Sequence, residues 1–155
     1  REEQLRKLLS LSRKLPTFNA AIRINYNTYF KSIYYKIDPN KYPMHLVLFP
    51  LLEWVEYRNA RNVNAKLIEF SDLYYEHPGY VRVDDEKMRL KIEAHRETEP
   101  IIGDWYNDVW LNWTPEMKNF HPTNPDFWEA VVKVQKKDLP IGMVKAYNSM
   151  IGNGK

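Results

Sequence analysis

Apolar residues between Thr17 and Ile37 recur every three or four positions, the spacing that places side chains on one face of an α-helix. The residues that follow this spacing are Phe18, Ala21, Ile22, Tyr26, Tyr29, Phe30, Ile33, Tyr34 and Ile37. Thr17 stands where an N-cap is expected, and the turn residues Asp38-Pro39-Asn40 follow the last apolar position. The pattern therefore predicts a helix over 17–37.

Two further segments of the first half also show helical spacing. The first contains Leu5, Leu8, Leu9, Leu11 and Leu15 and predicts a helix over 2–15 that Pro16 ends, so we expect residues 1–16 to form an extended N-terminal helix. The second begins at Pro50 and ends before His77-Pro78-Gly79. Its apolar positions are Leu52, Val55, Val63, Leu67, Phe70 and Tyr74. The short run 45–49 between these segments fits either a strand or the entry to the second helix.

Residues 80–94 change to a period of two, which is typical of a β-hairpin. Val81 and Val83 alternate with Arg82, and the charged residues 84–87 supply a turn. The alternation then resumes with Met88, Leu90, Ile92 and Ala94. Glu, Lys, Met, Leu and Ala are also strong helix formers, so a helix remains the alternative for this segment.

Proline residues mark the ends of the predicted elements in the last third of the chain. Thr114-Pro115 and Asn124-Pro125 each resemble an N-cap followed by proline in the first helical turn. The second pair predicts a helix that ends before Pro140, a last short helix runs to Met150, and residues 151–155 form a frayed tail. The whole pattern predicts a mainly α fold, α+β at most, built as a single domain over 1–155 with five or six helices and one short hairpin.

Composition narrows the range of functions. The 155 residues include five glycines and no cysteine, which excludes thiol nucleophiles and cysteine-ligated metals. The glycines do not cluster as a phosphate-binding loop requires, so we expect no cofactor, no metal and no enzymatic activity. No apolar run approaches the ~20 residues of a membrane-spanning helix, so we expect no transmembrane segment.

Charge is divided unevenly along the chain. Residues 1–41 carry nine Lys and Arg against three Asp and Glu, a net charge of +6, while the remaining residues carry a net charge of −3. A basic front either binds an anionic partner, such as RNA, DNA or anionic lipid, or is a solvated helix face. The basic residues assigned to partner binding are Arg6, Lys7, Arg13, Lys14, Arg23, Arg58 and Arg61.

The aromatic residues are the densest feature, with five Trp, eleven Tyr and six Phe. Trp and Tyr anchor many interfaces because each buries a large area at low conformational cost, although they also fill protein cores. As aromatic contacts to a partner we expect Trp105, Tyr106, Trp110, Trp113 and Trp128. Both roles, core and interface, remain open for the segment 101–113.

One cluster of histidine and acidic residues suggests a metal-binding or catalytic site. On a strand end, His95, Glu97 and Glu99 would point to one side and, with Asp104 and Asp108 nearby, could hold a divalent metal or an acid–base pair. The other interpretation is a charged, exposed strand end. A small metal-dependent hydrolase is therefore the second alternative.

The leading prediction is a non-enzymatic structural or accessory subunit of a larger multiprotein assembly, for example a mitochondrial respiratory, ATP-synthase or ribosomal complex. It would contact other protein subunits through its aromatic and basic surfaces. The first alternative is an RNA- or DNA-binding module that uses the basic N-terminal half.

Overall fold

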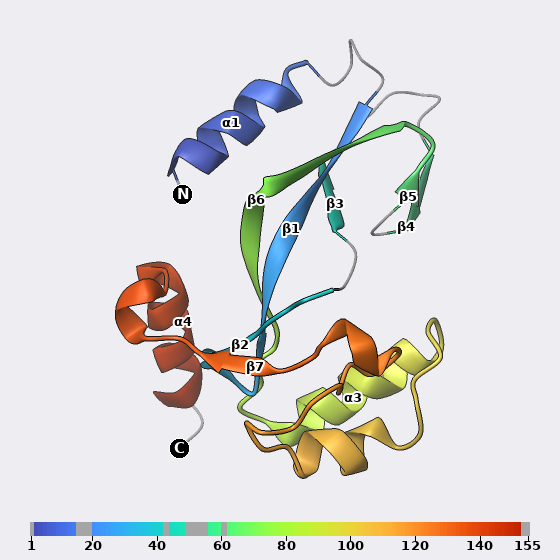
Figure 1. The fold of residues 1–155 in the computed structure, drawn as a ribbon, viewed down its shortest axis with the longest axis vertical. Coiled ribbons are helices and arrows are strands. Elements are labelled where there is room, and N and C mark those ends of the chain that lie inside the picture. The colour runs from blue at the N-terminus through green and yellow to red at the C-terminus, as the bar shows by residue number, and fades with distance from the viewer. Residues whose placement is uncertain (1, 15–19, 42–43, 49–55, 60–61, 153–155) are drawn as a thin grey trace. The chain divides into compact units, whose positions relative to one another are not determined.

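The computed structural model describes residues 2–14, 20–41, 44–48, 56–59 and 62–152 (Figure 1). In chain order its elements are α1 Glu2–Ser12, β1 Ala20–Phe30, β2 Ser32–Ile37, β3 His45–Leu48, β4 Tyr57–Asn59, β5 Asn62–Val63, β6 Lys66–Tyr80, α3 Asp85–Arg96, η1 Tyr106–Leu111, η2 Pro125–Phe127, β7 Val131–Lys133, η3 Lys136–Asp138 and α4 Ile141–Gly152. The fold is α+β around a five-stranded antiparallel sheet, so the prediction of a mainly α fold was wrong.

The sheet has the strand order β3-β1-β2-β7, and β6 pairs with β1. The antiparallel registers place Ile22 opposite Leu48 between β1 and β3, and Lys36 opposite Val132 between β2 and β7. Strands β4 and β5 form a separate two-stranded sheet. The sheet therefore joins the first and last thirds of the chain.

Strands β1 and β2 replace the helix predicted over 17–37; residues 17–19 lie outside the described part. Every second residue of β1 is buried, namely Ile22, Ile24, Tyr26, Thr28 and Phe30. The intervening Arg23, Asn25 and Asn27 are partly exposed. This alternation of β-branched and aromatic residues with polar ones suits a strand, and asparagine is a poor residue for a helix interior. Lys31, with a φ of 61°, then turns the chain between β1 and β2.

Strand β6 replaces the later part of the helix predicted from Pro50; residues 49–55 and 60–61 lie outside the described part. Phe70 lies between the exposed Glu69 and Ser71, and after one extra residue the buried Leu73 lies between the exposed Asp72 and Tyr74. The resulting interval of three between Phe70 and Leu73 resembles helical spacing. The segment 45–48 is a strand, β3, which is the first of the two alternatives that the sequence left open.

Helix α3 replaces the predicted hairpin, so the period of two was misleading there and the helical alternative holds. Asp84 has extended backbone dihedrals, and its side chain accepts a hydrogen bond from the backbone N–H of Glu86, which makes it the N-cap. Met88 and Ile92, four residues apart, are the buried positions of this helix. The four charged residues that suggested a turn are therefore the start of a helix.

In the last third, the Asn124 side chain accepts a hydrogen bond from the Asp126 N–H, as an N-cap does. The helix that follows, η2, spans only three residues and leads into β7, so the longer helix predicted here was wrong. The last predicted helix corresponds to α4. Residues 151–152 of the predicted tail belong to α4, and 153–155 lie outside the described part.

The chain divides into two compact units, each built from two segments. Unit 1 comprises Arg1–Tyr26 and Pro43–Tyr75, and unit 2 comprises Asn27–Tyr42 and Glu76–Lys155. Along the sequence, β1 and β6 each pass from one unit into the other. The prediction of a single domain over 1–155 stays a prediction.

Each unit has its own apolar core. The buried residues of the unit 1 core are Ala20, Ile22, Ile24 and Leu73. Unit 2 holds an aromatic cluster around Phe30 and a smaller cluster of Tyr29, Ile33, Val81, Leu139 and Val144. Within the described ranges, no helix is long and apolar enough to cross a membrane.

Candidate partner-binding site

Three of the five aromatic residues assigned to a partner lie in the core of unit 2. Trp105, Trp110 and Trp128 are buried, and Trp110 has 0% of its surface exposed. Their ring centroids lie 5.2–6.0 Å from that of Phe30, most in edge-to-face geometry. These three rings are not available to a partner in this structure.

The polar atoms of two of these rings are also satisfied internally. The indole N–H of Trp105 donates to the Phe120 carbonyl at 2.7 Å, and that of Trp110 donates to the Asp85 carboxylate at 2.7 Å. Lys31 places its ammonium 3.7 Å from the centre of the Trp110 ring and 3.8 Å from the same carboxylate. These contacts place Trp105 and Trp110 in the core, whereas Ile102 and Leu111 of the same segment are exposed.

The remaining two predicted aromatic residues are only partly buried. Trp113 packs edge-on against Tyr35 at 5.1 Å, and Tyr106 borders a surface groove described below. Partial burial and the carboxylates of Asp85 and Glu86 raise the pKa of Tyr106. Neither ring presents a broad exposed face.

The predicted basic residues of unit 1 are largely paired with acids. Arg6 contacts Glu2 at 2.7 Å and Lys7 contacts Asp72 at 2.6 Å, which lowers the pKa of the Asp72 carboxyl. Arg23 lies 3.5 Å from Glu69, while Arg13 and Lys14 are exposed. Arg61 and the side chain of Arg58 fall outside the described part. The nucleic-acid and lipid alternatives stay predictions.

The candidate metal cluster does not lie on a strand end. His95 occupies the last turn of α3, Glu97 is the C-cap, and the backbone N–H groups of Thr98 and Glu99 donate to the His95 carbonyl. Among the described residues, no group of three His, Asp or Glu side chains is arranged to hold a metal ion. The hydrolase alternative required His95, Glu97 and Glu99 on one side of a strand end, and that arrangement is not what the structure shows.

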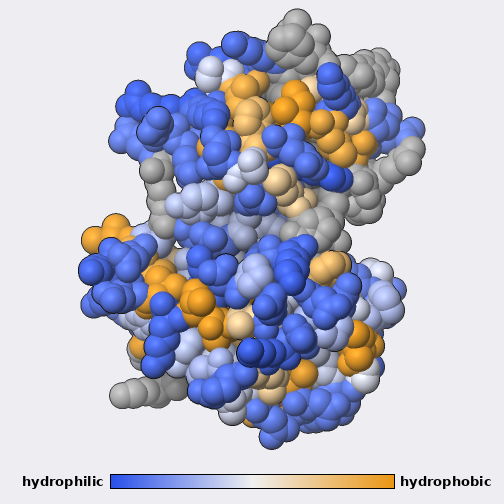
Figure 2. Space-filling model, in the orientation of Figure 1, coloured by the Kyte–Doolittle hydropathy of each residue, from blue (hydrophilic) through white to orange (hydrophobic). Residues whose placement is uncertain are grey.

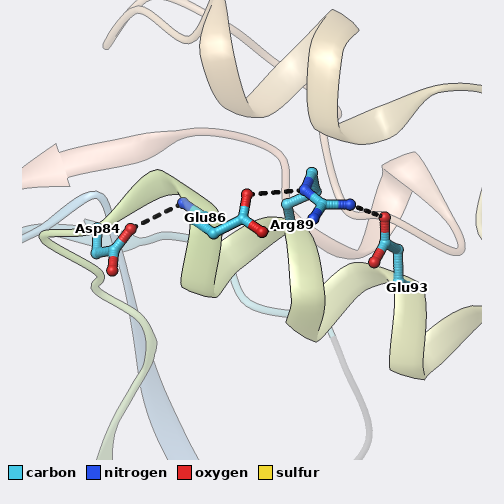
Figure 3. Close-up of polar contacts among 4 residues, drawn as sticks. All are labelled: Asp84, Glu86, Arg89 and Glu93. Atoms are coloured by element: carbon cyan, nitrogen blue, oxygen red, sulfur yellow. Dashed lines mark hydrogen bonds and ion pairs between the residues drawn. The ribbon is translucent and has the colours of Figure 1, made fainter.

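A polar groove of about 530 Å³ runs between α3 and η1. Figure 3 shows the α3 side of this region, where Arg89 binds both Glu86 and Glu93 on successive turns. Hydrogen bonds from Arg89 lower the pKa of Glu86 and raise that of Arg89 itself. Because these charged groups bind one another along the helix, they stabilise α3 and leave no concentrated charge for a ligand.

The other polar side chains that line this groove are also hydrogen-bonded to neighbouring residues. Arg96 donates to the Gly103 carbonyl at 2.7 Å, and Asn107 donates to Asp104 at 2.6 Å, which lowers the pKa of Asp104. Gly103 has a φ of +54°, a conformation that glycine adopts without strain. The groove is wide, but its polar groups already serve the local structure.

A second, smaller groove of about 110 Å³ lies beside α4 and is mainly apolar. One face of α4 contributes Met143, Ala146, Tyr147 and Met150, which follow the i, i+3, i+4, i+7 spacing. The opposite wall consists of Ile33, Pro78, Val81 and Arg82. The groove is thus formed by β2, the end of β6 with the two residues that follow it, and α4.

Helix α4 packs through one face and exposes several apolar side chains. Val144 packs into the cluster with Ile33 and Val81, and Tyr147 lies edge-on to Tyr34 at 6.0 Å. Ile141 is 75% exposed, and Met150 and Ile151 are more than two-fifths exposed. Hydrophobic residues gather on the surface over α4 (Figure 2). Such a patch beside a groove is typical of an interaction surface.

Arg82 is the one charged residue among those that line this groove. Its Nη1 donates to the Val81 carbonyl at 3.0 Å, and no carboxylate among the described residues pairs with it. Lys91 lies near Arg82; its Nζ donates to the Gly79 carbonyl at 2.8 Å and lies 3.5 Å from the centre of the Tyr80 ring. Burial and the charge of Arg82 lower the pKa of Lys91 to about 7.

Sequence reasoning missed this site. The spacing of residues 143, 146, 147 and 150 was visible within the predicted last helix, and two methionines on one face are a signal for an adaptable surface. The opposite wall could not be foreseen, because it depends on β2 and β6 being strands.

Comparisons with family models, with curated proteins and with solved structures found no match for this chain. Nothing in the fold or in these comparisons supports the mitochondrial, complex or subunit assignments predicted from the sequence, and those assignments are withdrawn.

Proposed function

We propose that this chain is a non-enzymatic protein-binding module that docks an apolar segment of a partner protein in the groove beside α4. The observation that carries this proposal is the apolar groove itself, on whose wall the exposed side chain of Met150 lies, while Ile141 and Ile151 add exposed apolar surface elsewhere on α4. A cavity of ~150 Å³ lined by aliphatic and aromatic residues holds a benzene molecule. A groove of about 110 Å³ therefore suits one large apolar side chain.

The side chains at the groove also suit binding. Met143 and Met150 are flexible and polarizable, so they can adapt to the shape of an incoming residue. Exposed apolar surface on α4 extends the contact beyond the groove, which a single anchoring residue requires for useful affinity. The geometry thus favours a short linear segment over a large flat partner surface.

A selection from a random peptide library displayed on phage tests the proposal. The full chain is immobilised, the enriched peptides are synthesised, and their affinity is measured by fluorescence anisotropy. We expect enriched peptides to share one large apolar residue. Ala146→Trp, which fills the groove, should abolish binding because Ala146 lines it.

Ser149→Trp is the matched control, since it adds the same ring on an exposed position of α4 that does not line the groove. It should leave binding unchanged, and thermal melting should show that both variants are folded. Failure to enrich any peptide, or equal binding to both variants, would refute the proposed function.

A further inference from the structure

We propose that the α4 groove selects apolar segments that carry a carboxylate near the anchoring residue, and that Arg82 recognises this carboxylate. This inference rests on the proposed function. It goes further, because it assigns the chemistry of the ligand and the residue that reads it.

The first argument is the position of Arg82. A guanidinium has five N–H donors in a planar fork, which matches the two oxygens of a carboxylate. One nitrogen of Arg82 donates to the Val81 carbonyl, and its other donors make no hydrogen bond to any described residue. The side chain is partly buried and lines a groove whose other walls are apolar.

The second argument is that the nearest acids in the sequence have other partners. Asp84 accepts the Glu86 N–H at 2.9 Å as the N-cap of α3. Asp85 accepts the Trp110 indole N–H and pairs with Lys31. Neither carboxylate neutralises Arg82, although both follow it within three residues.

The third argument is the local charge. Arg82 keeps its full positive charge at neutral pH beside apolar walls, whereas burial and Arg82 lower the pKa of the nearby Lys91 to about 7, so Lys91 is only partly charged there. Apolar walls exclude water and strengthen an ion pair formed against them. A carboxylate bound at Arg82 would neutralise the charge of the guanidinium while a nearby apolar residue of the same peptide enters the groove.

The chemistry favours a peptide over a free small carboxylate. The groove accommodates an apolar side chain and Arg82 accommodates an anion, so the ligand must present both groups a few ångströms apart. Asp or Glu two residues away from a large apolar residue satisfies this requirement on one extended chain, because alternate side chains point to the same side. The patch over α4 then contacts the flanking residues.

The test uses one peptide enriched for binding to the full chain, synthesised in two forms that differ only by Glu or Gln at the acidic position. We expect the Gln form to bind at least about tenfold more weakly, as for loss of a charge-assisted bidentate pair. Arg82→Gln should weaken the Glu form by a similar factor and leave the Gln form unchanged. Arg82→Lys should restore part of the preference, because the charge is kept without the fork.

Lys87→Gln is the matched control, since Lys87 is an exposed cation on α3 that does not line the groove. It should leave both affinities unchanged, and melting curves should verify that Arg82→Gln is folded. If the Glu and Gln forms bind the wild-type chain equally, the inference is wrong while the proposed function stands. If no peptide binds and the chain instead self-associates through α4 in sedimentation experiments, the occupant is a second copy and both proposals are refuted.

Discussion

Unit 1 and unit 2 bury their apolar surface with different kinds of side chain. In unit 2, Phe30 is surrounded by aromatic rings, and Trp110 among them is completely buried. In unit 1, the buried residues of the core cluster are small or aliphatic, with Phe70 and Tyr75 packed against them, and α1 has no buried residue. Leu5 and Leu9 of α1 are 57% and 55% exposed. Unit 2 therefore buries more large apolar side chains in its core than unit 1 does.

This difference changes the interpretation of the aromatic residues. A high aromatic content suggests contacts with a partner, yet in unit 2 most of these rings contact one another. The buried Trp110 N–H finds its acceptor on Asp85, which is an arrangement that suits a core. The binding surface that we propose lies instead at α4, where the exposed residues are aliphatic or methionine.

The substitution with the largest expected effect on this comparison is Trp110→Ala. Removing a fully buried indole should lower the free energy of unfolding by about 3–5 kcal/mol, because it leaves a cavity in the aromatic cluster. Chemical denaturation measures this loss. Leu111→Ala, an exposed position on the same element, should change stability little, and equal effects of the two would contradict the proposed dominance of the aromatic core.

A smaller loss is expected in the aliphatic core of unit 1. Leu73→Ala should cost about 2–3 kcal/mol, near the lower end for a buried leucine, since the surrounding cluster is small and can relax. Amide hydrogen exchange should show the loss mainly in β1, β3 and β6 of unit 1. Leu9→Ala is the exposed control. Loss of protection in α3 of similar size would show that the two units unfold together.

Asp85→Ala tests the polar contact that anchors the aromatic core. It leaves the Trp110 N–H buried without its acceptor, so we expect a loss of about 1–3 kcal/mol by thermal or chemical unfolding. Asp85→Asn keeps an oxygen acceptor and should recover most of the stability. If both substitutions are equally harmful, the charge of Asp85 toward Lys31 matters more than the indole hydrogen bond.

The last prediction concerns pH. Lys91 has a pKa of about 7 when folded, below its ordinary value of 10.5, since burial and Arg82 disfavour the charged form. Between these values the unfolded chain holds a proton that the folded chain has lost, so stability should rise as pH rises from about 7 toward 10. Lys91→Met should remove this rise in pH-dependent denaturation, whereas Lys87→Met should keep it. An unchanged profile in Lys91→Met would mean that the Tyr80 ring and the Gly79 carbonyl keep Lys91 charged.

Local patterns predicted the ends of elements better than their type. Asp38-Pro39 and Asn124-Pro125 were placed correctly as turn and cap, because these residues act on their own backbone. The type of β1 was missed because apolar residues at adjacent positions, such as Ala21 beside Ile22 and Tyr29 beside Phe30, fit both periods. Its β-branched residues and asparagines were the signal that favoured a strand.

The candidate site was beyond the reach of sequence reasoning for a different reason. The walls of the α4 groove come from β2, the end of β6 with the two residues that follow it, and α4, segments that are far apart along the chain. The burial of Trp110 likewise depends on Asp85 and Phe30, which lie in other elements. No local window contains the information that decides whether a ring lies in a core or on a surface.

The passage of β1 and β6 through both units has a consequence for synthesis and folding. Residues 27–42 of unit 2 leave the ribosome long before its second segment, and β2 waits for β7 as its partner. Contacts between such distant segments slow folding, and an unpaired strand edge is open to wrong pairing in the meantime. We therefore expect unit 2 to complete its fold only after synthesis has passed β7, with its apolar residues exposed until then.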